Sequence, residues 1–283
     1  MQIITLTTDM GLSDHYVAAL KGSIFQLERN ATIVDISHTI RPFDIVHATF
    51  CVKSVYKNFP KGSVHIIGVD SEPVINSRDG SYPAIMLYDG HYFVGNDNGL
   101  FALLVKEDQP EGFWMIDDVL SQPDGFRFPT KNLFVPAAVK LAQGVGINEI
   151  ASANESWKRA FTVNPVLEEN LIKGSIVHID HYGNAITNIS RELFYRFEED
   201  TPFTILFRKR DYYIDTISGS YNEVQPGERV AIFNSNDFLE IAINKGARGG
   251  TGGADSLFGL HIGDVVRIEF TPRGSAKTLD SLF

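Results

Sequence analysis

Two carboxylates bracket the first glycine of the chain, in the loop TTDMGLSD at residues 7–14. Asp9 and Asp14 follow a short run of apolar and β-branched residues, so they lie in the predicted loop between a first strand and a helix. A carboxylate there can bind a ribose, because each of its two oxygens accepts a hydroxyl donor. It can also bind a metal ion or stabilise the positive N-terminus of the following helix. The loop alone leaves these alternatives open.

Three other segments contain residue types found in metal, phosphate-binding or reactive sites, but for each of them a purely structural role is the better interpretation. His178, Asp180 and His181 are metal-ligand types, but residue 181 points to the opposite face of a strand and no further ligand stands nearby, so no metal is expected. The segment ARGGTGGADS at 247–256 lacks the sequence of a P-loop or of a dinucleotide turn and predicts a flexible surface loop. Cys51 falls within a predicted helix and is expected in the core.

The composition restricts the class of protein. With 283 residues the chain has room for two domains, and its formal net charge of −10 argues against a nucleic-acid-binding surface. No apolar run reaches the roughly 18 residues that a membrane span needs, so no membrane partner is expected. The segment MQIITLTTD lacks the basic start of a signal peptide, and a single cysteine suits a reducing compartment. A cytoplasmic location is therefore expected.

The first half of the chain alternates between strand and helix patterns. Apolar runs predict strands at 3–7, 31–37, 63–69, 84–88, 91–94 and 113–116, and helical spacing predicts helices at 14–27, 44–59, 100–105 and 134–142. Ser13 is the predicted N-cap of the first helix, and Asp89-Gly90 is a strong hairpin signal. The alternation predicts an N-terminal α/β domain with a largely parallel sheet between helices, which binds ligands at the carboxyl ends of its strands.

The pattern changes from about Leu171 onward. Short apolar runs separated by Gly, Asn and Asp predict strands at 172–179, 185–189, 204–207, 212–215, 230–234, 239–242 and 265–270. They predict a smaller C-terminal domain that is mostly antiparallel and barrel-like. The expected boundaries are 1–160 for the α/β domain, 161–170 for a linker and 171–283 for the β domain.

Several loops, taken together, resemble the S-adenosylmethionine hydroxide adenosyltransferase family, which also contains the S-adenosylmethionine-dependent fluorinase and chlorinase. In chain order they are TLTTDMGLSDHYVAALKG at 5–22, GNDNGL at 95–100, FVPAA at 134–138, IDHYGNAITNIS at 179–190 and NSNDFLEIAINKG at 234–246. The pairing of a TTDxG start with DxYGNxxTN is the specific part of the likeness. The resemblance extends over nearly the whole chain.

The resemblance implies a reaction. Members of this family displace methionine from the 5′ carbon of the ribose of S-adenosylmethionine, with water or a halide as the nucleophile. Methionine leaves as a neutral thioether, so the site needs no general acid. It has to fix an in-line geometry and strip water from the nucleophile. No cofactor is implied beyond S-adenosylmethionine as the substrate.

The resemblance also implies which residues bind the substrate. They are Asp9 for the ribose hydroxyls, Phe43 for the ribose pocket, Asp180 and Asn184 for the methionine amino and carboxylate groups, Tyr182 for adenine, and Asn234 and Ser235 for adenine or the methionine carboxylate. By this interpretation residues 1–160 form an adenosyl- and ribose-binding domain, and Asp14 belongs to the helix cap. A homotrimer is implied as well, with sites between subunits.

The chain departs from the family where water should be activated. Hydrolases of this family position water with an Asp–Arg–His set. Asp70 and Arg78 are present, but their loop VDSEPVINSRDG at 69–80 replaces the glycines of VDPGVG and is longer by one residue. Pro129 stands where the hydrolases have histidine, and Thr130 stands where the fluorinase uses a serine hydroxyl beside the halide.

Three functions are compatible with these departures. The expected one is a hydrolase in which Asp70 and Arg78 position water without a histidine, since displacement at a sulfonium needs less help from a base than acyl transfer does. The second is adenosyl transfer to a halide or another nucleophile held near Thr130. The third is a non-catalytic protein that binds an adenosyl ligand.

Overall fold

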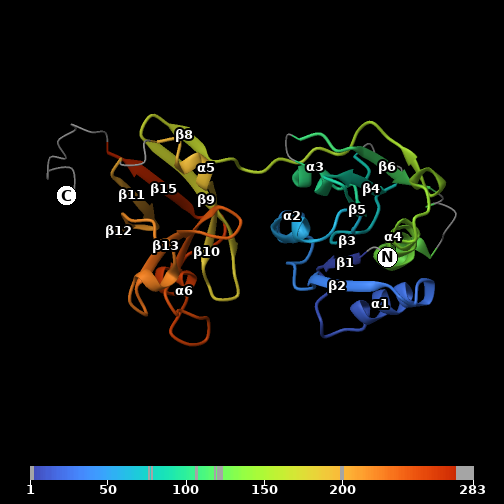
Figure 1. Cartoon of the computed structure of the whole chain (residues 1–283), viewed down its shortest axis with the longest axis horizontal. Helices are drawn as coiled ribbons and strands as arrows, with labels where there is room; N and C mark the ends of the chain where they lie inside the picture. The colour runs from blue at the N-terminus through green and yellow to red at the C-terminus, as the bar shows by residue number, and fades with distance from the viewer. Residues whose placement is uncertain are drawn as a thin grey trace. The chain divides into compact units, whose positions relative to one another are not determined.

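The structure is a computed structural model that describes residues 3–75, 77, 79–105, 108–117, 119, 124–197 and 201–271. The chain divides into two compact units, Met1–Thr162 and Val163–Phe283. Figure 1 draws the first unit in blue to yellow-green and the second in yellow to red.

The first unit is built on a seven-stranded sheet. Its strands lie in the order β2 (Thr32–Ser37), β1 (Ile3–Thr8), β3 (Val64–Gly68), β5 (His91–Asn96), β4 (Pro83–Tyr88), β6 (Gly112–Ile116) and β7 (Ala151–Ala153). The neighbours from β2 to β5 pair in parallel, and β4, β6 and β7 add antiparallel strands. The α/β class and the parallel part of the sheet, predicted from the sequence, are confirmed.

Helices cover both faces of this sheet (Figure 1). Helices α1 (Tyr16–Leu27) and α4 (Val135–Ala142) share one apolar core with β1 and β3. Helices α2 (Ile45–Val55) and α3 (Leu100–Val105) share a second core on the other face. Both central strands are therefore buried on two sides, so even their polar residues Thr5, Thr7 and His65 are buried and neither strand alternates between buried and exposed positions.

Two helix starts differ from the prediction. The first helix begins at Tyr16 rather than at residue 14, and neither Ser13 nor the N-cap residue His15 makes a side-chain cap hydrogen bond. Asp14 is exposed ahead of the helix. The last helix of this unit is preceded by a π-helix, η4 (Thr130–Phe134), which extends it by one turn. Propensity does not reveal this π-turn, because its residues are ordinary helix formers.

The Asp89-Gly90 hairpin is confirmed. Both residues have positive φ, 50° and 71°, as a two-residue turn between twisted antiparallel strands requires. The turn joins β4 to β5, whose register pairs Tyr88 with His91.

A buried polar cluster lies inside the core on the side of α2. Thr5 Oγ1 lies 2.8 Å from His65 Nδ1, and His65 Nε2 lies 3.2 Å from His91 Nδ1. The rings of Tyr56 and Phe93 surround this pair, with ring centroids 5.3 Å from His91 and 4.9 Å from His65. Burial, with a smaller effect from His91, lowers the pKa of His65 to about 3. The two imidazoles are therefore neutral in the folded protein near pH 7.

The second unit is one antiparallel sheet of eight strands. Their order is β12 (Lys209–Ile214), β11 (Phe203–Phe207), β15 (Val265–Phe270), β9 (Leu171–Ile179), β10 (Ala185–Ser190), β14 (Phe238–Ile243) and β13 (Arg229–Phe233), with β8 (Val166–Glu168) paired to β9. The two ends of this order meet, because the Arg229 guanidinium of β13 lies 5.1 Å from the ring centroid of Tyr213 of β12. The antiparallel β class is confirmed.

Short elements occupy segments where the sequence predicted none. Strands β7 and β8 lie between residues 148 and 170, a region of weak periodicity. Helix α6 (Ala254–Phe258) begins inside the glycine-rich segment 247–256, which was predicted to be a surface loop throughout. The remaining short helices are α5 (Arg191–Phe194), η1 (Tyr56–Asn58), η3 (Gly125–Arg127), η5 (Ile147–Glu149) and η6 (Tyr221–Glu223).

Two further sequence expectations concern the interior and the membrane. Cys51 is half-buried against the core on the side of α2, and burial raises the pKa of its thiol to about 11. In the described part of the chain, no helix combines the length and apolar character that crossing a bilayer requires.

Candidate functional site

Polar residues follow the parallel strands of the first unit at one edge of the sheet. Thr8 at the end of β1 is the register partner of Gly68 at the end of β3. Asp9 comes directly after Thr8, Asp70 follows Gly68 by two residues, and Asn96 ends the neighbouring strand β5. This is the carboxyl edge, where α/β sheets bind ligands.

Asp9 is anchored on one side and available on the other. Its Oδ2 accepts a hydrogen bond of 2.8 Å from the backbone N–H of Phe43, while Oδ1 has no partner among the described residues. Phe43 adopts φ 63° and is 69% exposed. A left-handed backbone is unfavourable for phenylalanine, so the carboxylate helps to hold this residue in place. The structure thus brings together the two residues that were predicted to form the ribose pocket.

A buried network beneath Asp9 fixes the loop that carries it. Thr8 Oγ1 lies 2.8 Å from His38 Nδ1, and His38 Nε2 lies 3.1 Å from Asp35 Oδ1. The His38 carbonyl accepts the Gly11 N–H at 2.7 Å. Burial alone would raise the pKa of Asp35, but the hydrogen bond from Lys21 and the nearby His38 imidazole outweigh it and lower that pKa. The imidazole thus binds the end of β1 through Nδ1 and lies beside Asp35 of β2, although its Nε2 makes no hydrogen bond within the described residues.

Asp70 is held by an asparagine pair. Its backbone has φ 47°. Asn98 Nδ2 donates to the Asp70 carboxylate at 3.1 Å and to its carbonyl at 2.9 Å, and Asn96 Nδ2 donates to the same carbonyl at 3.3 Å. The GNDNGL segment therefore fixes the loop in which the family glycines are missing. Arg78, the predicted partner of Asp70, lies outside the described residues, and Glu72 of the same loop is exposed.

Thr130 lies against the end of β3. It is 0% exposed, and its Oγ1 has no hydrogen-bond partner among the described residues. A Cβ on Gly68 would come within 2.5 Å of the Thr130 methyl and 2.6 Å of its hydroxyl. Only glycine fits at residue 68 beside this side chain. Pro129, which replaces the family histidine, immediately precedes it as the N-cap of η4.

The Thr130 hydroxyl, which has no partner among the described residues, is expected to lower the stability of the folded protein. Thr130→Val has nearly the same shape and removes a buried group that costs free energy when it is unpaired, so the free energy of unfolding should rise by about 1 kcal/mol. Urea denaturation measures it. Thr49→Val is the control, because the buried Thr49 hydroxyl donates to the Ile45 carbonyl at 2.7 Å and its loss should not stabilise. Destabilisation by Thr130→Val would show that the hydroxyl is satisfied in solution.

In the second unit, Asp180 and Asn184 bind each other across a turn. The Asn184 N–H donates to Asp180 Oδ1 at 2.8 Å and its side-chain amide donates to Oδ2 at 3.0 Å. Gly183 between them has φ 89°. Tyr182 projects from the same turn and is 60% exposed. Each Asp180 oxygen keeps a lone pair for another donor, so the turn presents an oriented carboxylate beside an exposed ring.

Asn234 shapes the turn between β13 and β14. Its Oδ1 accepts hydrogen bonds from the backbone N–H groups of Asn236 at 3.0 Å and Phe238 at 3.2 Å. Its amide donates to Glu240 Oε2 at 3.3 Å. Ser235 is exposed in this turn. Of the two predicted residues, the first supports the turn and the second faces solvent.

Glu240 and Tyr221 were not predicted from the sequence. The Tyr221 hydroxyl donates to Glu240 Oε1 at 2.6 Å, and Glu240 is 3% exposed. Burial, with a smaller contribution from the charge of Asp180, raises the pKa of Glu240. This carboxyl group therefore links Asn234 to the Asp180 turn electrostatically. The only signal in the sequence was a glutamate inside the apolar run FLEIAI.

Removing the Glu240 carboxyl group should destabilise the second unit. Glu240→Ala empties a buried position and removes the acceptor of two partly exposed donors, Tyr221 and Asn234, so it should lower the free energy of unfolding by about 2 kcal/mol. Glu240→Gln keeps acceptor capacity and removes a charge that burial disfavours, so it should cost about 1 kcal/mol or less. Glu192→Ala, at an exposed position, is the control. Equal losses for the alanine and glutamine variants in urea denaturation would contradict the proposed role of the hydrogen bonds.

No group of three or more His, Cys, Asp or Glu side chains is arranged to hold a metal ion in the parts of the chain that the structure describes. His178, Asp180 and His181 thus form no such group.

Two family models match the chain. The model of the SAM hydroxide adenosyltransferase N-terminal domain matches residues 4–151, and that of the C-terminal domain matches residues 174–267. Together they cover well over half of the sequence and fall one in each unit.

Individual relatives support the same likeness. A Methanocaldococcus jannaschii protein named (R)-S-adenosyl-L-methionine hydrolase is 29% identical over 254 residues, 86% of this chain and 88% of that protein. A Thermus thermophilus protein of the same name is 26% identical over 95% of this chain and 100% of that protein. A Nocardia brasiliensis protein named fluorinase is 26% identical over a smaller part, 67% of this chain and 71% of its own. The crystal structure of an uncharacterized conserved protein from Thermotoga maritima matches with a TM-score of 0.82 and 25% identity, over 94% of this chain and 99% of that chain.

Proposed function

Because the chain belongs to the SAM hydroxide adenosyltransferase family, we propose that it hydrolyses S-adenosylmethionine to adenosine and methionine. The names of two relatives, from Methanocaldococcus jannaschii and Thermus thermophilus, support this reaction. The observation that carries the proposal is Asp9, whose free Oδ1 stands at the carboxyl edge of the sheet beside an exposed aromatic side chain.

Asp9 binds the ribose in this proposal. Oδ1 accepts one hydroxyl of the ribose, and the second lone pair of Oδ2 accepts the other, because Phe43 uses only one. A diol bound by an ionised carboxylate is oriented as well as held. The Phe43 ring then lies against the sugar and excludes water from that side.

The reaction is a single displacement at the ribose 5′ carbon. A bond forms from the water oxygen to this carbon as its bond to sulfur breaks, and sulfur keeps the electron pair. The sulfonium becomes a neutral thioether, and the attacking water loses one proton, which passes through the Asp70 carboxylate to solvent. The Asp70 carboxylate accepts a hydrogen bond from that water, with its orientation set by Asn98. Arg78 supports the same position.

Residues of the second unit recognise the two ends of the substrate. Asp180 binds the ammonium group of methionine, and Asn184 assists it. Tyr182 stacks on adenine, for which a ring that is 60% exposed is suited. Asn234 and Ser235 supply polar contacts to adenine or the methionine carboxylate.

A second reaction is favoured by one observation, the unpaired Thr130 hydroxyl. A hydroxyl without a partner can donate to a halide, so the chain would transfer the adenosyl group to chloride or fluoride. The loss of the family histidine at Pro129 instead favours a protein that binds the adenosyl ligand without turnover.

One assay separates these functions. Purified protein is incubated with S-adenosylmethionine, with and without chloride, and the nucleosides are separated by chromatography with mass detection. We expect adenosine and methionine, and Asp70→Asn should reduce the rate by about 10²–10⁴-fold, the usual effect of losing a proton acceptor. Asp79→Asn, in the same loop but exposed, is the matched control.

The other possible outcomes of this assay would each support a different function. A 5′-halo nucleoside would establish the halide reaction. Nucleoside bound without turnover would establish a binding protein. Arg78→Ala should lose turnover while binding is kept, and unchanged turnover would remove Arg78 from the mechanism.

We also propose a homotrimer that works in the cytoplasm. The half-buried thiol of Cys51, with its raised pKa, suits a compartment where cysteines stay reduced. Light scattering coupled to size-exclusion chromatography tests the trimer directly.

A further inference from the structure

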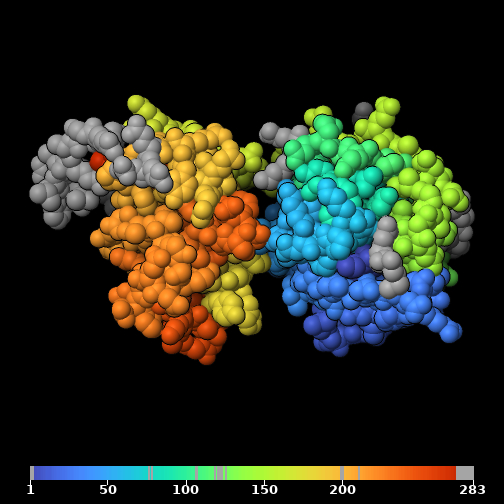
Figure 2. All heavy atoms as spheres, in the orientation of Figure 1, coloured from blue at the N-terminus to red at the C-terminus, as the bar shows by residue number. Residues whose placement is uncertain are grey.

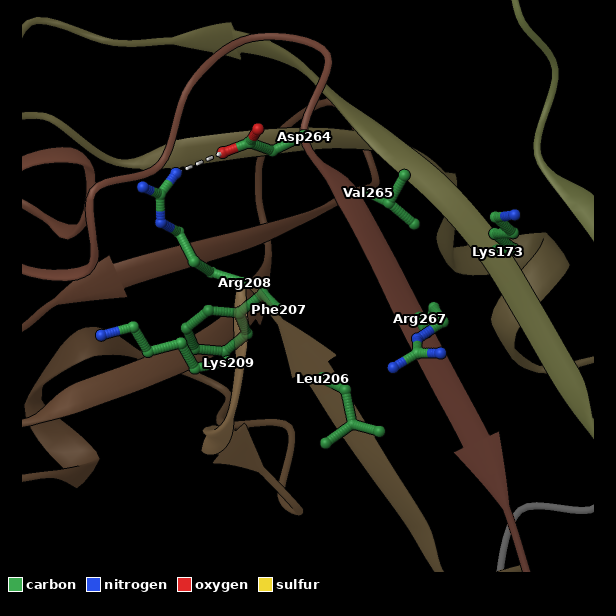
Figure 3. A pocket seen from close by; sticks show the side chains of 8 residues that line it. All are labelled: Lys173, Leu206, Phe207, Arg208, Lys209, Asp264, Val265 and Arg267. Atoms are coloured by element: carbon green, nitrogen blue, oxygen red, sulfur yellow. Dashed lines mark ion pairs between the residues drawn. The ribbon is translucent and has the colours of Figure 1, made fainter.

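A cavity in the second unit contains none of the residues assigned to the adenosyl ligand. It measures about 650 Å³ and opens on the outer face of β9, β15 and β11. Figure 3 shows that four cationic side chains, Lys173, Arg208, Lys209 and Arg267, surround it together with one carboxylate, Asp264. This volume is in the range of small-molecule sites.

Two of the cations oppose each other directly. Lys173 on β9 and Arg267 on β15 are register partners in an antiparallel pair. Like charges at such positions are destabilising. Within the part of the chain that the structure describes, neither side chain makes an ion pair or a hydrogen bond. A bound anion between them would turn this repulsion into attraction.

The other two cations complete the positive rim. Arg208 lies 3.7 Å from Asp264 in the only ion pair drawn in Figure 3. The same Asp264 oxygen accepts the His261 N–H at 2.9 Å, so its charge is already engaged. Lys209 contacts only the ring of Tyr212, at 5.9 Å from its centroid, among the described residues. The lining thus carries four positive charges against one negative.

We propose that this cavity binds a small multivalent anion of the phosphate class, such as a polyphosphate or a nucleoside polyphosphate. The cluster is unusual on a chain whose net charge is −10, and the acidic remainder would repel a long nucleic acid. Guanidinium and ammonium groups together suit phosphate oxygens. Leu206 and Val265 add an apolar border that an organic moiety can cover.

The proposed ligand differs from the substrate in charge. S-adenosylmethionine carries a sulfonium, an ammonium and a carboxylate, so it is a net cation that this rim repels. The proposal therefore goes beyond the adenosyl site and stands or falls independently of the proposed hydrolysis.

The test is isothermal titration of the whole protein with inorganic triphosphate as the probe. We expect one saturable site per chain whose affinity falls with added salt. The double variant Lys173→Gln, Arg267→Gln should bind at least about tenfold more weakly. Both positions are exposed on strands, and removing the repulsion should not unfold the domain. Arg196→Gln, which removes one charge from an exposed site elsewhere in the same unit, should change affinity less than twofold, a difference of about 0.4 kcal/mol.

Four results would overturn the proposal. The first is the absence of saturable binding, and the second is an equal loss in Arg196→Gln, which would indicate unspecific attraction to any cation. The third is displacement of triphosphate by excess S-adenosylmethionine, which would assign the probe to the adenosyl site. Binding of a single-stranded oligonucleotide without binding of triphosphate would replace the proposal by a nucleic-acid surface.

Discussion

Replacing Asp9 with alanine is expected to abolish measurable binding of adenosine and of S-adenosylmethionine. The variant loses two hydrogen bonds from a charged acceptor to the ribose, each worth about 1.5–3 kcal/mol. Together they correspond to a weakening of about 10²–10⁴-fold. Isothermal titration with adenosine, which does not turn over, measures the loss without interference from the reaction.

Two further variants separate recognition from loop structure. Asp9→Asn can still accept the Phe43 N–H but offers the ribose one acceptor fewer, so it should bind about 10–100-fold more weakly. Asp14→Ala changes an exposed carboxylate of the same loop and should bind normally. Unchanged affinity in Asp9→Ala would refute the assignment of Asp9 to the ribose.

Acid is expected to destabilise the first unit through His65. Its pKa is about 3 in the folded protein, well below the ordinary 6.5 of histidine, because it is buried. The unfolded chain therefore binds more protons between these two pKa values, and stability falls as the pH is lowered through this window. The slope is about 1.4 kcal/mol per pH unit from His65 alone, so about 2 kcal/mol is lost between pH 6.5 and 5. His91, whose pKa burial also lowers, adds to it.

The measurement is urea denaturation at a series of pH values. His65→Gln keeps a polar side chain beside Thr5 and His91 but cannot bind a proton, so its stability should depend less steeply on pH below 6.5 even if it is lower throughout. His181→Gln, at an exposed position, should keep the slope of the parent. The same slope in His65→Gln would show that other groups control acid unfolding.

The fold was predictable where local pattern and tertiary burial agree. The apolar residues of β1 and β3 reflect burial on both faces, and Asp89-Gly90 specifies its turn through backbone conformation. Strand β8 escaped prediction because its three residues are exposed and form a strand only by pairing with β9. The start of α1 was predicted two residues too early because Ser13 is a good capping residue, but its side chain makes no cap hydrogen bond in the structure.

The site was predictable only in part, for a similar reason. The roles of Asp9 and Asp70 stay predictions. Asp9 was identified from its position after a strand, and Asp70 was identified through the family resemblance. His38 and Glu240 were not, because their importance lies in hydrogen bonds to residues 19–30 positions away along the chain. Their side chains are buried and hydrogen-bonded only in the folded chain, so the sequence pattern around them does not reveal that they support the site.

The contact between Gly68 and Thr130 restricts how this protein can evolve. Any side chain at residue 68 collides with the threonine, so a mutation there is rejected until residue 130 has become smaller. The reverse order is open, since serine or alanine at 130 leaves the glycine undisturbed. Lineages that acquire a side chain at residue 68 must therefore change residue 130 first, and the order of the two substitutions is set by this contact.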